Sequence, residues 1–263
     1  MLTIREYKQA ASLEEAWQLN QKRMNRVLGG MLWLRMTKGN VQTAIDLSGL
    51  GLNTIEETDT EFRIGAMVTL RQLELDAGFT AYSEGANKEA LRHIVGVQFR
   101  NLATVGGSVF GRFGFSDVIS LLLVMDSYVE LYKGGLVPMA DFVKMKYDRD
   151  ILVRIIVKKQ KAHFCYQSVR ISKTDFPVLT CAAALNEDGV QIAVGARPAK
   201  AALVKDDKQL AALPLTEEKA QAFAEYAAEL LPTESNPRGS AKYRMHLIKV
   251  LAKRTLLELG GKK

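Results

Sequence analysis

Cysteine and histidine are scarce in this chain, with two of the former and three of the latter among 263 residues. The cysteines, Cys165 and Cys181, are too few to hold an iron–sulfur cluster or a structural zinc by themselves. The histidines, His93, His163 and His246, share no local metal-binding spacing. We therefore expect no metal site in this chain, so any redox chemistry requires an organic cofactor or a partner protein.

Long hydrophobic runs are also missing. The apolar stretch Val118–Met125 is far shorter than the roughly 20 residues that a membrane-spanning helix needs. The first ten residues, MLTIREYKQA, carry charges where a secretory signal would have its apolar stretch. We therefore predict a cytoplasmic protein that does not bind membranes.

The composition is that of a globular protein, with 48% apolar and 25% charged residues. The length suffices for two modest domains or one large one. The formal net charge is +7, but the basic residues are scattered rather than gathered in one segment. Nucleic-acid binding requires a concentrated basic surface, so we expect no nucleic-acid partner.

Periodicity and capping signals predict an α+β protein. Ser12 and Glu15 form a capping box that predicts a helix over 12–25, and Thr69 with Gln72 begins another. Further helices are expected at 118–125, 216–230 and 240–258. Strands are expected at 26–28, 44–47, 61–66, 127–132, 151–157, 164–169, 178–185 and 190–194.

Two domains follow from this order of elements. A first domain of mixed short strands and helices covers residues 1–160, with two subdomains that divide near 52–58. The second domain, residues 161–263, is expected to hold a three-stranded antiparallel sheet followed by two helices. The polar, basic stretch 158–162 marks the boundary.

Two Gly-Gly pairs are the candidate binding segments. Gly29-Gly30 and Gly106-Gly107 are each expected to follow the end of a short strand. Glycine allows unusual backbone angles and leaves no Cβ in the way, so consecutive N–H groups can converge on an anion such as a pyrophosphate. Thr104 and Ser108 add hydroxyl donors. A tight turn is the alternative interpretation of either pair.

Neither pair fits the common nucleotide-binding motifs. The sequence lacks Gly-x-Gly-x-x-Gly, and we expect no βαβ unit around either pair. It also lacks Gly-x-x-x-x-Gly-Lys-Ser/Thr. The usual nicotinamide-binding fold and a nucleotide hydrolase are therefore not supported.

The context of the two pairs resembles a known family. Phe99–Ser108 closely resembles the "IRNxATIGGN" motif of flavin-binding subunits in the xanthine dehydrogenase and carbon monoxide dehydrogenase family. The first pair resembles the family's "AGGTDLL". In the same order along the chain, further segments resemble the family: Phe115–Asp117, Val137–Phe142, Asp150–Leu152, Arg170 with Asp175–Thr180, and Ser240–Leu251.

This resemblance implies a fold and a cofactor. The expected fold is the two-part FAD-binding domain of the vanillyl-alcohol oxidase type plus a small C-terminal domain. FAD would be bound non-covalently, because Met31 occupies the first-segment position where some relatives attach it. The cofactor-binding residues carried over from the family are Leu28, Gly29, Gly30, Met31 and Leu32, then Thr104, Val105, Gly106, Gly107 and Ser108, and finally Asp117 and Leu152.

The resemblance also implies roles for these residues. The backbone N–H groups of 28–32 and 104–108 would hold the diphosphate from two sides. Asp117 would accept hydrogen bonds from the ribose or adenine end, and Leu152 would lie against the adenine or isoalloxazine surroundings. Arg100 and Asn101 would position the second segment, or they belong to a helix end or turn.

The implied function is that of an oxidoreductase subunit active only in a complex. A large subunit would carry molybdopterin and a small subunit a 2Fe-2S cluster, and electrons would pass through FAD to NAD or another acceptor. No residue of this chain is named as a catalytic acid or base. The alternatives are a flavin-free structural or assembly subunit that keeps the fold, and a stand-alone flavin oxidase.

Several positions depart from the family pattern. Met31 stands where relatives carry Thr or Ser, and Ser108 where Asn is common. Trp33 is either a packing residue or a lid over the flavin. Arg112 either supplies charge to a phosphate or is an ordinary exposed arginine.

Overall fold

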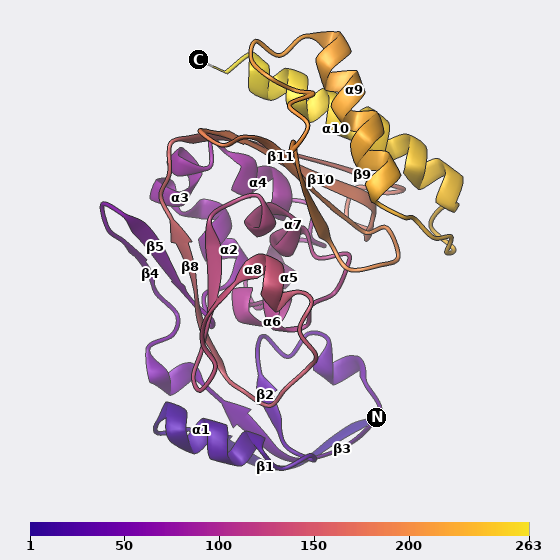
Figure 1. The fold of residues 1–263 in the computed structure, drawn as a ribbon. Helices are drawn as coiled ribbons and strands as arrows, with labels where there is room; N and C mark the ends of the chain where they lie inside the picture. Colours follow the sequence, from indigo (N-terminus) through magenta and orange to yellow (C-terminus); the bar gives the residue numbers. More distant parts are fainter. Residues whose placement is uncertain (263) are drawn as a thin grey trace.

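The computed structural model describes residues 1–262 and contains three β-sheets (Figure 1). The N-terminal sheet has the order β1-β3-β2, with β1 (Leu2–Gln9), β2 (Arg26–Leu28) and β3 (Gly39–Asp46) all parallel. Helix α1 (Leu13–Asn20) connects β1 to β2 and packs on β3. Parallel strands joined through a helix form a βαβ unit. The expectation that no such unit surrounds a Gly-Gly pair is therefore wrong for the first pair, which follows β2.

Helix α1 is shorter than the predicted 12–25. It begins as expected, because the Ser12 hydroxyl accepts a hydrogen bond from the Glu15 N–H at 3.1 Å. It ends at Asn20 because side chains from outside the helix take up its last carbonyl groups. The Asn25 amide donates to the Leu19 oxygen at 2.8 Å, and Arg149 donates to the Asn20 oxygen at 2.8 Å.

The middle sheet is antiparallel throughout, in the order β4-β5-β8-β6-β7. Its strands are β4 (Ile55–Glu57), β5 (Glu61–Gly65), β6 (Ser127–Leu131), β7 (Gly135–Pro138) and β8 (Leu152–Lys158). Seven short helices pack around it: α2 (Leu70–Leu75), α3 (Ala77–Tyr82), α4 (Ala86–Leu91), α5 (Val97–Arg100), α6 (Val105–Phe110), α7 (Asp117–Leu123) and α8 (Met139–Phe142). The 3-10 turns η1 (Leu34–Met36) and η2 (Ser48–Leu50) complete this half.

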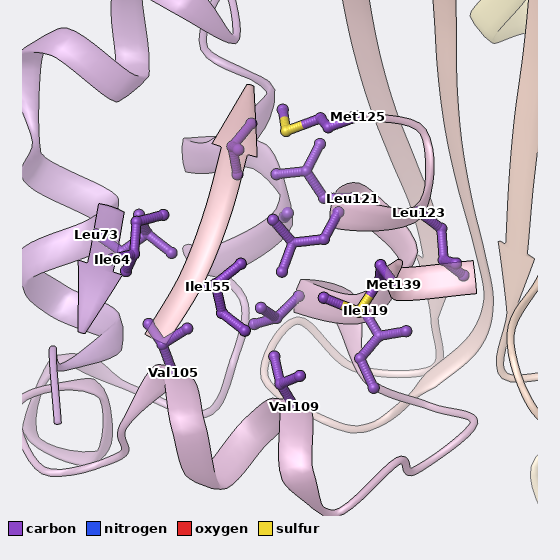
Figure 2. Close-up of a cluster of buried hydrophobic side chains, with 14 of the residues drawn as sticks. Ile64, Leu73, Val105, Val109, Ile119, Leu121, Leu123, Met125, Met139 and Ile155 are labelled. Carbon is purple, nitrogen blue, oxygen red and sulfur yellow. The ribbon is translucent and has the colours of Figure 1, made fainter. Parts of the chain in front are cut away.

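The main core lies between β8 and the helices α6 and α7 (Figure 2). Val105 and Val109 of α6 and Ile119 of α7 are fully buried there, together with Ile155 of β8. Burying a side chain of this kind stabilises the fold by about 1.5–3 kcal/mol. This core fixes the starts of α6 and α7, which carry the second Gly-Gly pair and Asp117.

The C-terminal sheet has four antiparallel strands in the order β12-β11-β10-β9, not the three predicted. The strands are β9 (Ala162–Arg170), β10 (Pro177–Asn186), β11 (Gly189–Gly195) and β12 (Ala202–Lys205). The additional strand, β12, has only four residues and includes Ala and Lys, which are not strand formers. It forms by pairing with the edge of β11, and that pairing is a tertiary contact with no local signal.

Helices on both sides bury the middle of this sheet. Helices α9 (Glu217–Leu230) and α10 (Ala241–Gly260) cover one face, and α4 and α7 pack on the other (Figure 1). Along β10, the first eight residues are all buried, with Cys181 and Ala183 facing the α9–α10 side and Ala182 and Ala184 facing the main core. Within residues 1–262, no helix is long and apolar enough to cross a membrane.

Candidate functional site

The two Gly-Gly segments touch each other through their main chains. A Cβ on Gly30 would lie 1.8 Å from the carbonyl oxygen of Leu102, and a Cβ on Gly29 would lie 2.9 Å from the Thr104 hydroxyl. Atoms cannot approach so closely, so any larger residue at Gly30 would push the segments apart. The glycines are therefore explained by this close approach and not by a tight turn alone.

The first segment presents a row of free backbone amides. Met31 has φ of 62°, a left-handed conformation that is uncommon outside glycine. No residue of 1–262 accepts a hydrogen bond from the backbone N–H groups of residues 30–33. Unpaired N–H groups in a row, with a left-handed residue among them, form a concave site suited to an anion.

The second segment differs from the expectation. The N–H groups of Val105 and Gly106 donate to carbonyl oxygens in the 66–68 segment at 2.8 and 2.9 Å. The next two amides donate to Thr104, one to its hydroxyl and one to its carbonyl oxygen, at 3.1 and 3.0 Å. The prediction that residues 105–108 offer free N–H groups is therefore wrong.

The local structure explains this difference. No strand precedes the second Gly-Gly pair; instead, Thr104 caps helix α6, and the two glycines lie in its first turn. Because that turn already uses its amides, the segment faces the first one with the hydroxyl group of Thr104. The Ser108 hydroxyl also lines the α7 side of the cleft, but it donates to the Thr104 carbonyl oxygen at 3.0 Å.

Two adjoining cavities flank the contact between the segments. We name them by their walls: the α7 cavity, of about 290 Å³, reaches Asp117, and the β8 cavity, of about 720 Å³, reaches Leu152. They share the lining residues Val27, Gly29, Trp33, Leu34, Thr104, Gly107 and Phe113, so together they form one cleft.

Nearly all residues expected at the site line this cleft. The α7 cavity is lined by Gly29, Gly30, Met31, Leu32, Thr104, Gly107, Ser108 and Asp117, and the β8 cavity by Leu28, Gly106 and Leu152. Val105 is the exception, because its side chain is fully buried in the main core (Figure 2). Its place in the motif reflects packing of α6 and not contact with the cleft.

Asp117 is held by the C-terminal sheet. It begins helix α7, and its Oδ1 accepts hydrogen bonds from the Tyr166 hydroxyl and from Arg170 Nη2. Arg170 is fixed in turn by donating to the Asp175 carbonyl oxygen at 2.6 Å. Desolvation raises the pKa of Asp117 to about 6, although Arg170 and the Tyr166 hydrogen bond favour its charged form. One oxygen of this carboxylate is thus occupied by protein donors, which the sequence did not predict.

Arg100 holds the second segment in position. It ends helix α5 and is buried, and its guanidinium makes two hydrogen bonds to Glu74 of α2, at 2.8 and 3.2 Å. Asn101 follows as the C-cap of α5. Both interpretations of this pair therefore hold for Arg100, since it lies at a helix end and also anchors the chain just before Thr104.

Arg112 fits neither of its two interpretations. It is only 3% exposed and does not line the cleft. Its guanidinium stacks on the ring of Phe142, 3.9 Å from the centroid, and its Nε donates to the Phe142 carbonyl oxygen at 3.0 Å. It is a structural arginine that ties α6 to α8.

Sequence reasoning missed most of the aromatic lining. Besides Phe99, four rings line the α7 cavity, those of Trp33, Phe113, Phe115 and Phe176, and we call these four the aromatic wall. Only Trp33 was noticed as a candidate. Phe113 and Phe115 lie within the second motif region, so a search for aromatics near the glycines finds them, but nothing local connects Phe176 to the first two segments.

Comparison with known proteins agrees with this geometry. Residues 3–159 match the family model of the FAD binding domain in molybdopterin dehydrogenase. The chain belongs to this family. Residues 164–259 match the CO dehydrogenase flavoprotein C-terminal domain. The expected family and the fold class, an FAD-binding part followed by a C-terminal flavoprotein domain, are confirmed, apart from the fourth strand of the C-terminal sheet.

Similar proteins match nearly the whole chain. The nicotine 6-hydroxylase medium subunit of Paenarthrobacter nicotinovorans is 26% identical, over 97% of both chains. The xanthine dehydrogenase FAD-binding subunit of Escherichia coli O157:H7 is also 26% identical, over 100% of this chain and 99% of the relative. A solved structure of carbon monoxide dehydrogenase from Hydrogenophaga pseudoflava has the same fold, with a TM-score of 0.85 at 23% identity, covering 97% of this chain and 96% of that chain.

FAD is the cofactor of this family, and the cleft fits its parts. A diphosphate carries negative charge that suits the free amides of residues 30–33. The main chain of residues 102–103 can pass against the segment that carries those amides only because Gly30 lacks a side chain. Flat apolar rings suit the aromatic wall, since aromatic side chains stack favourably with planar groups.

Proposed function

We propose that this chain is the FAD-binding electron-transfer subunit of a molybdenum hydroxylase complex. The observation that supports this most directly is the row of free amides at residues 30–33, which opens into a cleft lined by the family's motif residues. FAD would supply the ability to accept and release electrons, and the protein would bind and orient it.

Each part of the cleft has a proposed role. The amides of residues 30–33 bind the diphosphate, and the hydroxyl of Thr104 donates to it from the opposite side. The Ser108 hydroxyl lines the cleft but donates to the Thr104 carbonyl oxygen at 3.0 Å. Asp117, held by Arg170, uses its remaining carboxylate oxygen to accept a hydrogen bond from a sugar hydroxyl. Leu152 and Leu28 offer apolar surface in the β8 cavity. FAD is held non-covalently, because no Cys or His within 1–262 lines the cleft.

The partner subunits complete the proposed reaction path. A small subunit with a 2Fe-2S cluster would deliver electrons from a molybdopterin-containing large subunit, and this chain would pass them to NAD or another acceptor. The nicotine 6-hydroxylase relative is named a medium subunit, which supports this division of labour. The chain would be active only within the complex.

The proposed domain boundary follows the sequence. We keep the division into residues 1–160, split near 52–58, and 161–263 as a proposal. The two family matches, 3–159 and 164–259, support it.

A visible spectrum tests the cofactor proposal. The chain is purified, incubated with excess FAD and passed through a desalting column. We expect it to retain about one flavin per chain and to show the absorption bands of bound flavin. A well-folded chain that stays colourless would contradict the proposal and favour a flavin-free structural or assembly subunit.

Co-purification tests the partner proposal. The chain, tagged in its native host, should elute with two other subunits and with molybdenum and iron in fixed ratio to flavin. An isolated chain that oxidises an organic substrate by itself would instead indicate a stand-alone flavin oxidase.

A further inference from the structure

The aromatic wall joins three distant parts of the chain. Trp33 follows the first Gly-Gly pair, Phe113 and Phe115 follow α6, and Phe176 precedes β10. Trp33 stacks on Phe176 with ring centroids 5.5 Å apart and planes at 27°. Phe115 meets Phe176 edge-on at 4.7 Å, and Phe113 stacks on Phe115 at 5.1 Å. These contacts make a continuous aromatic surface along the α7 cavity.

Packing alone does not account for this wall. Trp33 remains 45% exposed and Phe113 44% exposed, although each is a large apolar ring. Rings that serve only the core are normally buried, and clustered exposed apolar surface marks a place where something binds. The exposed area of these two rings borders the cleft, since both line its two cavities.

Trp33 has a fixed position relative to the amide row. Its own N–H is the last of the four free amides of residues 30–33. Its ring is held by the Phe176 stack at the side of the cleft where Asp117 and Arg170 lie. A ligand whose diphosphate sits on the amides therefore extends its next group past the indole when it enters the α7 cavity.

We propose that Trp33 is a positioning residue that contacts the isoalloxazine ring of FAD, which occupies the α7 cavity against the aromatic wall. The adenine end then lies in the β8 cavity. This inference rests on the proposed function, because it requires FAD in the cleft.

Flavin emission tests the contact directly. A flavin that touches an indole loses its fluorescence, because the indole transfers an electron to the excited ring, whereas a phenyl ring does not. We expect bound FAD to be nearly dark in the wild-type chain and severalfold brighter, with a longer lifetime, in W33F. The control W17F removes the other tryptophan, which lies on α1 beneath Lys133, and should leave the emission dark.

A second measurement does not depend on the W33F variant. In W17F, Trp33 is the only tryptophan, so its emission reports on the cavity alone. FMN should quench it strongly, and ADP, which lacks the flavin ring, should leave it unchanged. W33A should also weaken FAD binding about tenfold through loss of stacking.

The outcomes separate the two proposals. If FAD binds but its emission is equally dark in W33F and wild type, or if ADP quenches Trp33 as strongly as FMN does, this inference is overturned while the proposed function stands. If the wild-type chain takes up no FAD, the proposed function fails and the inference fails with it.

Discussion

Single residues decide the shape of the cleft, and Gly30 does so most strictly. Its missing side chain is what allows residues 102–104 to pass against the first segment. Thr104 uses its hydroxyl to cap α6 and also lines both cavities. Local changes at these positions should therefore alter cofactor binding more than they alter the overall fold.

Gly30→Ala should weaken FAD binding by about tenfold or more. Forcing an added methyl group into packed main chain costs about 1–3 kcal/mol, and the segments must separate to relieve it. FAD titration measures the effect. Gly49→Ala is the control, because its Cβ would meet only the Gln9 side chain at 3.4 Å. Equal affinity in both variants would contradict the proposed contact.

Asp117 should make stability depend on pH. Its pKa is raised from 3.8 to about 6 on folding, so between these values the folded chain binds a proton that the unfolded chain has lost. The stabilising contribution is present below about pH 4 and is lost as pH rises to about 6. Wild type should thus lose about 3 kcal/mol relative to Asp117→Asn over this range. Urea unfolding at several pH values measures it, and a difference that does not change with pH would argue against it.

At the scale of elements, the sequence predicted those with strong local signals. The capping box at Thr69 is confirmed, with Gln72 donating and accepting as expected, and the two C-terminal helices lie where predicted. Strand β1 was not predicted, because its sequence LTIREYKQ is mostly polar and shows little alternation of apolar and polar residues. Helix α6 was missed because glycine disfavours helices by about 1 kcal/mol per residue, although Thr104 is a valid N-cap.

The ion pair between Arg100 and Glu74 joins α5 to α2. Arg100→Met removes one of the two arginines that pair with the buried Glu74 and leaves Arg71 at 2.9 Å, which should lower the free energy of unfolding by about 2 kcal/mol. It should also weaken FAD binding, since the segment that touches Gly30 follows α5. Arg92→Met is the control, because its ion pair with Glu89 is exposed and such pairs contribute about 0–1 kcal/mol. Urea unfolding and FAD titration measure the two effects. Equal free energies of unfolding and equal FAD affinities in the two variants would contradict the proposed role of Arg100.

At the scale of the whole molecule, the cleft draws on segments that are far apart in sequence. The motif around Gly106 predicted one side of the cleft. The resemblance to the family predicted the first Gly-Gly segment and Leu152 as further parts of the site. Arg170 and Phe176 lie more than 50 residues after Asp117 and could not be connected to it, because only the packing of the C-terminal sheet against α7 brings them together. The cytoplasmic location predicted from the sequence stays a prediction.

A site assembled in this way should bind FAD only when the chain is folded. At a FAD concentration of about 100 times Kd, binding should stabilise the fold by about 2.7 kcal/mol. Thermal unfolding with and without FAD measures this as a rise in Tm. Gly30→Ala at the same FAD concentration should show a smaller rise, and an unchanged wild-type Tm would mean that FAD does not bind the folded state.

The four amides of residues 30–33 give the cleft an unusual tolerance to mutation. Every amino acid except proline brings the same N–H group, whatever its side chain. Replacement of Thr by Met at position 31 therefore keeps the N–H groups that bind the diphosphate, provided that Gly30 is kept. Gly30 is required where the two segments of the chain touch. The residues after it can change their side chains and gain new contacts, such as those of the Trp33 indole.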